Sequence, residues 1–485
     1  MPPLQRALRS FDATMIVIGS MIGSGIFITS AESARLVGAP GWLLVAWGLA
    51  GILTITGALT CAELAAAFPR AGGQYVFLRN AYGPGVGFLF GWALFTVIQS
   101  GTIAAVAVAF ASFLGVLVPG ISPVRFVVPP ITIGGSGFAV SLSTEQLAAL
   151  LSILLLTFAN ARGLKQGVRV QNISTVAKIA ALAGLVVVGL SFGDHSAGAA
   201  RTSSWWNPAA NGAAQVSTFA LLMLLGRAMV GPLFAQSAWN NVTFAGAEIE
   251  NPGRNLPRAL LLGCATVVGL YLLANIAYVT VLPLDGIQHA PNNRVAVALM
   301  EAILGPTGGV LMAAVIVIST FGCNNGLILS GARVYYAMAR DGLFFAKAGL
   351  VNSRAVPAVA LAFQGVWAAV LTLPRTVTSG PGGPVYGNVY TQLLEYIIAA
   401  DMVFYGLMIA AVFVLRRRAP AVARPYRVWG YPLVPVIYLL VDLLLVADLS
   451  YLTPRTAGIG YLLVLAGVPV YFVWRRFAVP IPETA

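Results

Sequence analysis

Two stretches of small and polar residues interrupt long apolar runs and carry the clearest chemistry in this sequence. The first stretch comprises Ile22, Gly23, Ser24, Gly25 and Ile26. A helix broken at these residues would expose consecutive amide N–H groups at the start of its outer half, where the helix dipole favours an anion. A substrate carboxylate would fit this position. Close packing between helices through small residues is the alternative explanation for the triplet Gly23 to Gly25.

The second stretch runs from Gly231 to Asn241 and contains a proline and several polar residues. Such residues should open the hydrogen-bond ladder of a buried helix, which is tolerated where the bare backbone lines a cavity or meets a ligand. We expect unpaired carbonyls near Leu233, Phe234 and Ala235, at the negative end of the first half-helix, where an ammonium group would bind. One break for an anion and one for a cation together suit an amino acid.

Side chains of the second stretch complete the predicted pocket. The candidates are Phe234, Ala235, Ser237, Trp239 and Asn240. Phe234 and Trp239 are candidates for an aromatic lid or wall over the substrate, with ordinary core packing as the alternative.

Lys178 lies well inside an apolar run, where an ammonium group is costly and needs partners. We expect it to bind carbonyls of the first broken helix, with the hydroxyl of Ser319 or Thr320 as a further partner. A fixed positive charge there would replace a bound sodium ion. Two alternatives stay open: Lys178 carries a proton, or it reaches the cytoplasmic interface.

The composition places these residues in a membrane. Of 485 residues 59% are hydrophobic and 9% charged, with a mean hydropathy of +0.87, which excludes a soluble multidomain protein. The net charge of +13 comes from basic residues scattered between apolar runs, which argues against nucleic acid as a partner. Cys61, Cys264 and Cys323 lack metal-ligand spacing, and we expect no metal and no cofactor.

Twelve apolar runs are long enough to cross a bilayer as helices. They lie near 11–34, 41–66, 85–117, 146–160, 171–192, 216–248, 260–282, 300–337, 356–374, 390–415, 431–451 and 456–474. The breaks fall in the first and sixth runs. We therefore predict an all-α polytopic protein with a transport core of five plus five inverted helices, residues 1–425, in which helices 1 and 6 are discontinuous. Residues 426–485 would form two accessory helices.

The basic residues also predict an orientation. With the N-terminus in the cytoplasm, twenty of the 28 basic residues fall in inside loops and six in outside loops; Lys178 and Arg227 lie within helices. This bias predicts that both termini are cytoplasmic and, for a bacterial-type cell, that the protein lies in the inner membrane. Glu63, near the inner end of the second helix, is expected to pair with a loop arginine.

Ordered motifs give the chain a resemblance to a known family. They are Ile22-Gly23-Ser24-Gly25-Ile26-Phe27, Pro69-Arg70-Ala71-Gly72-Gly73-Gln74-Tyr75, Val170-Gln171-Asn172 with Lys178, Leu233-Phe234-Ala235 with Trp239-Asn240, Asn251-Pro252 with Arg254-Asn255-Leu256-Pro257, and Gly331-Ala332-Arg333 with Arg340-Asp341-Gly342. In these motifs the chain resembles the amino acid–polyamine–organocation permeases, and among them the L-type amino acid transporters.

The resemblance implies sodium-independent transport of amino acids by alternating access in a five-plus-five fold. It implies that amides around Ser24 and Gly25 bind the α-carboxylate, that carbonyls near Phe234 bind the α-amine, and that Phe234 gates the outer side. It further implies that Lys178 replaces sodium.

The chain departs from the L-type pattern at four positions, Pro232, Gln236, Ser237 and Ala238, which leaves the preferred side chain open. Animal members join a single-span glycoprotein through a cysteine after helix three. No cysteine occurs in 118–145, so we expect no disulfide-linked glycoprotein subunit.

The sequence therefore predicts a carrier or exchanger of L-α-amino acids, most simply neutral ones, whose partners are the substrate and the lipid bilayer. A proton-coupled permease, or one for cationic amino acids or polyamines, is the alternative within the same class. A channel or a membrane enzyme is the alternative from a different class. We expect no enzymatic activity, because His195 and His289 lie unpaired in outside loops.

Overall fold

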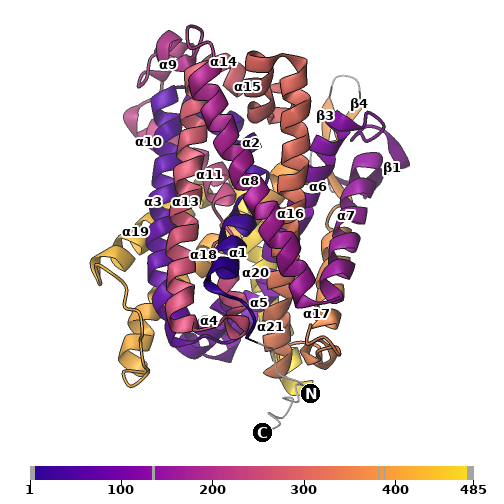
Figure 1. Cartoon of the computed structure of the whole chain (residues 1–485), viewed down its shortest axis with the longest axis vertical. Coiled ribbons are helices and arrows are strands. Elements are labelled where there is room, and N and C mark those ends of the chain that lie inside the picture. The colour runs from indigo at the N-terminus through magenta and orange to yellow at the C-terminus, as the bar shows by residue number, and fades with distance from the viewer. Residues whose placement is uncertain (1–5, 134–136, 381–382, 387–388, 478–485) are drawn as a thin grey trace.

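The computed structural model describes residues 6–133, 137–380, 383–386 and 389–477, which fold into a helical bundle with a small sheet at its rim (Figure 1). The chain enters through α1 (Ser10–Met21) and α2 (Gly25–Val37), two helices bent by 41° that together form the first predicted span. Three non-helical residues, 22–24, separate them, where the sequence places a glycine and a serine. The predicted break in helix one is confirmed.

The rest of the first half contains four further spans. They are α3 (Pro40–Ala67); α5 (Pro84–Ala93), the π-helical turn η1 (Leu94–Ile98) and α6 (Gln99–Leu117) in one rod; α7 (Thr144–Ala161); and α8 (Leu164–Phe192). A short helix, α4 (Gln74–Tyr82), links α3 to α5.

The second broken span comprises α10 (Thr218–Ala228) and α11 (Val230–Ala235), which together are apolar enough to cross a membrane. The helix stops at Ala235, whereas the predicted apolar run continues to residue 248. The remainder of that run holds only α12 (Asn241–Phe244) and η3 (Gly246–Glu248). The predicted break is confirmed, and its second half is much shorter than expected.

The remaining elements complete the bundle. They are the short helices α9 (Ala199–Thr202) and η2 (Pro208–Asn211) before α10, α13 (Pro252–Val281), α14 (Leu284–Gln288), η4 (Pro291–Asn293), α15 (Val295–Leu304), α16 (Pro306–Arg340), η5 (Ala346–Gly349), α17 (Ala358–Val370), α18 (Val389–Arg418), α19 (Leu433–Leu452), α20 (Pro454–Leu465) and α21 (Gly467–Phe477). Gly305, with a positive φ, and Pro306 separate α15 from α16, which the sequence joined in one run.

Within the described residues, ten helices are long and apolar enough to cross a membrane, or eleven with the bent pair α1–α2. The shorter α17 occupies the ninth predicted run. Each of the twelve predicted runs thus corresponds to a helix or helix pair, and the protein is a multi-pass membrane protein.

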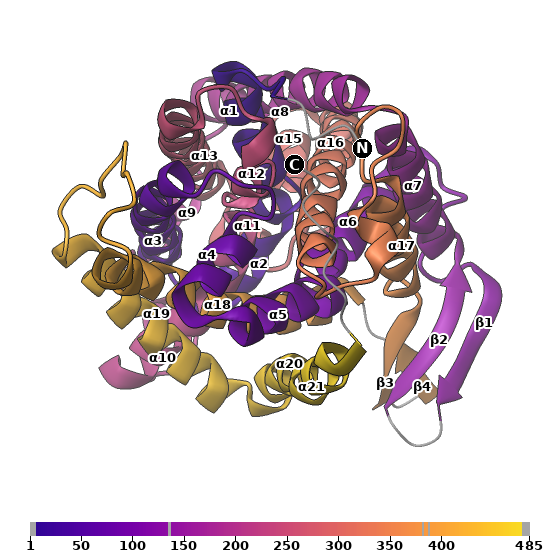
Figure 2. The ribbon, with the colours of Figure 1, turned by 90° about the horizontal axis from the view of Figure 1, so that it is seen from below.

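A four-stranded antiparallel sheet joins two loops that are distant in sequence. Its order is β1 (Phe126–Ile133), β2 (Phe138–Ser143), β3 (Pro374–Gly380) and β4 (Gly383–Tyr386). Val140 of β2 lies opposite Pro374 of β3, and the sheet projects from the rim of the bundle (Figure 2). The pairing of β2 with β3 was not predicted from the sequence.

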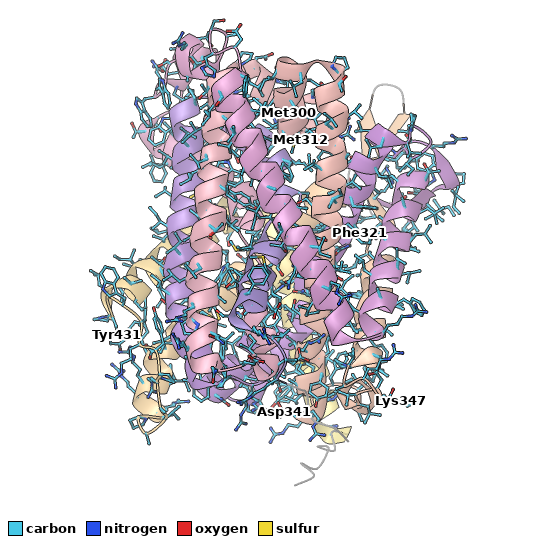
Figure 3. All side chains as sticks on the ribbon, in the orientation of Figure 1. Met300, Met312, Phe321, Asp341, Lys347 and Tyr431 are labelled. Atoms are coloured by element: carbon cyan, nitrogen blue, oxygen red, sulfur yellow. The ribbon has the colours of Figure 1, made fainter. Side chains whose placement is uncertain are left out.

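The bundle has two distinct ends. In Figure 1, α9, α14 and α15 lie at the upper end, which we call the α15 end, and α4, α17 and α21 lie at the lower end, which we call the α4 end. Figure 3 places Met312 of α16 toward the α15 end and Asp341, just after α16, at the α4 end. The long helix α16 therefore runs through most of the bundle.

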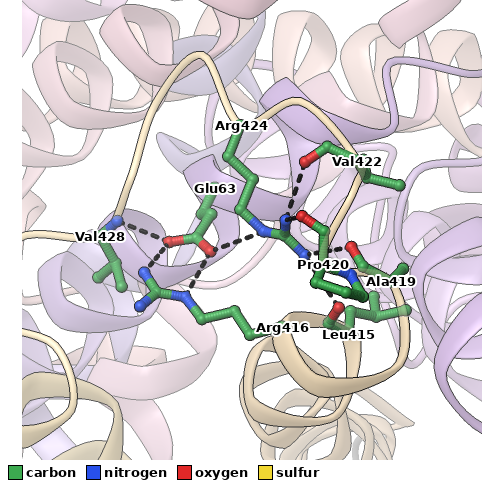
Figure 4. A network of polar contacts seen from close by, with 8 residues as sticks. All are labelled: Glu63, Leu415, Arg416, Ala419, Pro420, Val422, Arg424 and Val428. Atoms are coloured by element: carbon green, nitrogen blue, oxygen red, sulfur yellow. Dashed lines mark hydrogen bonds and ion pairs between the residues drawn. The ribbon is translucent and has the colours of Figure 1, made fainter.

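Glu63 holds the α4 end together (Figure 4). Its buried carboxylate accepts hydrogen bonds from Arg416 Nε at 2.8 Å, from Arg416 Nη2 at 2.6 Å and from the Val428 amide at 2.8 Å. Arg424 Nε lies 3.6 Å from the same carboxylate. The predicted pairing of Glu63 with a loop arginine is confirmed, and it links α3 to α18 and to the segment before α19.

Candidate functional site

The two helix breaks meet inside the bundle. A Cβ atom placed on Gly25 would lie 2.5 Å from the Cβ of Ala235, and one placed on Gly231 would lie 2.6 Å from the Cβ of Thr29. Carbon atoms cannot approach this closely, so only glycine permits the contact of α2 with α11. The sequence predicted both breaks, and the structure brings them together.

The helix-one break creates a new helix N-terminus inside the bundle, that of the 13-residue helix α2. The α1 ladder ends where the Ile22 amide donates to the Ile18 carbonyl at 2.9 Å, and α2 begins at Gly25 after Ser24. The first N–H groups of any α-helix lack acceptors within that helix and carry the positive end of its dipole. Ile22, Gly23, Ser24, Gly25 and Ile26 are all buried at this point.

Lys178 binds the other side of this break, as predicted. Its ammonium donates to the carbonyl of Gly19 at 2.6 Å and to the carbonyl of Ile22 at 2.9 Å, and the side chain is 1% exposed. The alternative in which Lys178 reaches the cytoplasmic interface is therefore wrong. The ammonium supplies positive charge to carbonyls that the break has released from α1.

Ser319 and Thr320 do not join Lys178 as expected. The Thr320 hydroxyl donates to the Ile316 carbonyl of its own helix at 2.8 Å, as threonines within helices often do. The buried Ser319 hydroxyl has no hydrogen-bond partner among the described residues. The lysine instead passes Gly322 of α16, where a Cβ atom would lie 3.2 Å from the Lys178 Cε.

The helix-six break lies between Ala235 and Asn241, with Ala238 at a φ of 64°. The Phe234 carbonyl accepts the Ser237 amide at 3.1 Å and its hydroxyl at 2.8 Å. The Ala235 carbonyl lies 3.3 Å from the Tyr271 hydroxyl. The expectation of unpaired carbonyls is thus wrong for Phe234, whereas the Ala235 carbonyl shares the Tyr271 hydroxyl with another acceptor. An ammonium group would have to share or displace these hydrogen bonds.

A polar stripe on α13 contacts the first broken helix and was missed by the sequence reasoning. Tyr271 Oη lies 3.0 Å from the Met21 carbonyl, and Tyr278 Oη lies 3.3 Å from the Ile26 carbonyl. Between them, Asn275 Oδ1 accepts from the Ser30 hydroxyl at 2.7 Å. Tyr271, Asn275 and Tyr278 follow the i, i+4, i+7 spacing of one helix face, the signal that could have revealed them.

Trp239 and Asn240 face α18 and α4. The ring of Trp239 stacks on Tyr405 with centroids 5.2 Å apart. Asn240 Nδ2 donates to Gln74 Oε1 at 2.5 Å, and Tyr405 Oη donates to Asn240 Oδ1 at 3.3 Å. These contacts fix the non-helical segment from the α4 side, and Trp239 is packed against α18.

Two cavities adjoin the breaks. One of about 90 Å³ lies between α2 and α10–α11 and is lined by Thr29, Ser33, Arg227 and Gly231. The other, of about 10 Å³, has Ser237, Ala238 and Asp401 in its wall. Polar groups and open space thus lie beside α10–α11 and beside the helix-six break.

A polytopic bundle in which two broken helices meet, the first of them bound by a buried lysine and a polar stripe, is typical of a membrane transporter. The chain belongs to the amino acid permease family, whose model, described as "Amino acid permease", matches residues 8–473. This is not a family of enzymes, and the resemblance stated from the motifs is confirmed.

Three relatives show what the chain is similar to. It is 31% identical over 476 residues to the large neutral amino acids transporter small subunit 2 of Homo sapiens, covering 97% of this chain and 80% of the relative. It is 30% identical to the serine/threonine exchanger SteT of Bacillus subtilis, with 98% of each chain covered. The Asc-type amino acid transporter 1 of Mus musculus is 30% identical, with 97% and 82% covered.

Proposed function

We propose that the protein is a sodium-independent exchanger of L-α-amino acids, neutral ones first among them, that works by alternating access. The observation that carries this proposal is the Lys178 ammonium on the carbonyls of Gly19 and Ile22. A sodium ion bound at a helix break would need such carbonyl oxygens as ligands. With the Lys178 ammonium already bonded to them, helix one needs no sodium to hold its broken shape.

The substrate would lie between the breaks. Its α-carboxylate would accept hydrogen bonds from the first amides of α2, around Ser24 and Gly25, and its α-ammonium would bind the carbonyls of Phe234 and Ala235. Phe234 is buried in the last turn of α11 and would move aside to gate the outer side. The relatives are amino acid transporters by name, which supports this cargo.

The α4 end would face the cytoplasm and the α15 end the outside. The arginines of the Glu63 network lie at the α4 end, in agreement with the positive-inside rule. Both termini would then be cytoplasmic, and the bacterial relative supports a cell membrane location. Residues 1–425 would form the inverted-repeat core and 426–485 two accessory helices. The loop 118–145 lacks cysteine, so we propose no disulfide-linked glycoprotein subunit.

Counterflow in proteoliposomes tests this function. Vesicles loaded with unlabelled L-serine should take up labelled L-serine, L-threonine or L-leucine equally fast in sodium and in choline buffer. Vesicles without internal amino acid are the control, and slower uptake into them identifies exchange. No uptake of any proteinogenic amino acid by folded protein would refute the proposal, and a strict sodium requirement would refute the role of Lys178.

Asp401 favours a second candidate, a proton-coupled or cationic amino acid permease. Its carboxylate is 5% exposed and lines the small cavity beside Ser237 and Ala238. An acidic residue this close to the helix-six break would suit a positively charged substrate side chain or a proton. Uptake of L-lysine, or uptake driven by an imposed pH gradient, would favour this candidate over neutral exchange.

A further inference from the structure

A third, charged cavity lies at the α15 end and shares Ile28 and Asn293 of its wall with the cavity between α2 and α10–α11. It has a volume of about 650 Å³, within the range of small-molecule sites. Its wall includes the ionisable side chains of Glu145, Arg294 and Arg375, from the start of α7, the η4–α15 connection and β3. Opposite charges therefore face one cavity.

Glu145 is the residue of this cavity that most needs a partner. It is 7% exposed, and its carboxylate makes no hydrogen bond or ion pair with any residue in the described ranges. Arg294 and Arg375 are near enough to interact with it through their charge, but neither contacts it. Burying a carboxylate without a bonded partner is costly, so this position favours an incoming cationic group.

Arg294 offers the complementary group. Its Nη2 donates to the carbonyl and to the hydroxyl of Ser112, at 2.8 and 2.9 Å, and its guanidinium lies 5.4 Å from the centre of the Phe113 ring. These contacts with α6 fix the side chain in place. Its Nε is buried without a hydrogen-bond partner among the described residues. The guanidinium therefore lines the cavity with a positive charge that no carboxylate among the described residues contacts directly.

Arg375 plays a different part. Its Nε donates to the Ser141 hydroxyl at 2.9 Å, and its Nη2 donates to the Pro123 carbonyl at 3.0 Å and to the Ser143 hydroxyl at 3.1 Å. These bonds tie β3 to β2 and leave Arg375 as a structural residue that adds positive charge. The open pair in the cavity is Glu145 and Arg294.

We propose that this cavity is a second binding site for a zwitterionic α-amino acid, with the ammonium on Glu145 and the carboxylate on the guanidinium of Arg294. The inference rests on the proposed function, because it assumes the same cargo. A zwitterion would satisfy both buried groups without adding net charge, whereas a simple anion or cation would satisfy only one.

The position of the cavity indicates what the second site does. Val108 and Ala109 of α6 line it, and Val106, less than one turn away, lies 4.0 Å from a Cβ atom placed on Gly23. Ile28 of α2 also lines the cavity, one turn beyond the helix-one break. An amino acid bound in this cavity would lie next to the central site on the proposed outer side. It could then move from the cavity into the central site.

Binding stoichiometry of the purified full-length protein tests the proposal. Equilibrium binding of labelled L-serine, and separately of L-leucine, should give two sites per chain with different affinities. Glu145→Gln should weaken one of them by about 10-fold or more, because a charge-assisted hydrogen bond is lost, and should leave the other unchanged. Asp285→Asn, an exposed carboxylate in α14 at the same end, is the matched control and should leave both sites intact.

Arg294→Lys provides a second test if Glu145→Gln does not fold. It keeps the positive charge but removes the planar guanidinium, so it should also weaken one site only. A single site per chain in the transport-competent protein, with an affinity that neither variant changes, would overturn the second site and leave the proposed function standing. A protein that neither binds nor transports amino acids would refute both.

Discussion

Replacing Lys178 is the sharpest test of how helix one is held. In Lys178→Ala the carbonyls of Gly19 and Ile22 lose donors at 2.6 and 2.9 Å and stay buried in the bundle. Each hydrogen bond to a charged group contributes about 1.5–3 kcal/mol, so losing both disfavours the competent shape of the break by about 3 kcal/mol or more. At about 1.4 kcal/mol per factor of ten, exchange should fall about 100-fold.

The assay is L-serine counterflow. Each variant is reconstituted at the same amount of folded protein, and its folding is checked by size-exclusion chromatography and thermal melting. Lys178→Met keeps the volume of the side chain and should fail like the alanine variant, whereas Lys347→Ala changes an exposed lysine at the α4 end (Figure 3) and should leave exchange unchanged. If Lys178→Ala exchanges serine at a rate within twofold of the parent protein, the lysine–carbonyl contacts are not needed for transport. The argument for sodium independence from Lys178 would then be refuted.

Three further changes test other contacts. Gly25→Ala should abolish exchange, because its methyl group would lie 2.5 Å from the Cβ of Ala235. Gly269→Ala is the control and should exchange normally, since no neighbouring atom lies within 4 Å of the new methyl group. Equal activity of the two variants would contradict the close approach of α2 to α11. Tyr271→Phe should slow counterflow about 5- to 30-fold by removing a hydroxyl worth about 1–2 kcal/mol, with little change in expression; an unchanged rate would exclude that hydroxyl from transport. Glu63→Gln should lower the thermal melting temperature, because the free energy of unfolding falls by about 1–3 kcal/mol when the ion pair with the partly exposed Arg416 is lost. An unaltered melting curve would mean that this ion pair does not stabilise the protein.

The sequence was sufficient wherever one residue type carries a strong local signal. Glycines and a proline inside apolar runs located both breaks, and a lysine far from water required carbonyl partners that the structure supplies from helix one. Neither inference needed knowledge of distant contacts, because a membrane leaves backbone groups and charges few alternatives.

The contacts that sequence reasoning missed depend on pairings between distant segments. Tyr271 looks like an ordinary core aromatic until its position against Met21, 250 residues away in sequence, is known. The strand pair β2–β3 likewise joins loops that follow different helices. Ser319 or Thr320 was expected as a further partner of Lys178, but local sequence patterns do not fix the rotation of α16 about its axis.

The Tyr271 hydroxyl has a consequence that follows from counting its protons. It lies 3.0 Å from the Met21 carbonyl and 3.3 Å from the Ala235 carbonyl, but a phenol carries one hydrogen and donates to one acceptor at a time. The two broken helices therefore compete for the same proton. An ammonium group that arrives at Ala235 would leave the proton to Met21 at no loss in the number of hydrogen bonds. Helix one would in this way respond to occupancy at helix six through the rotation of a single O–H bond.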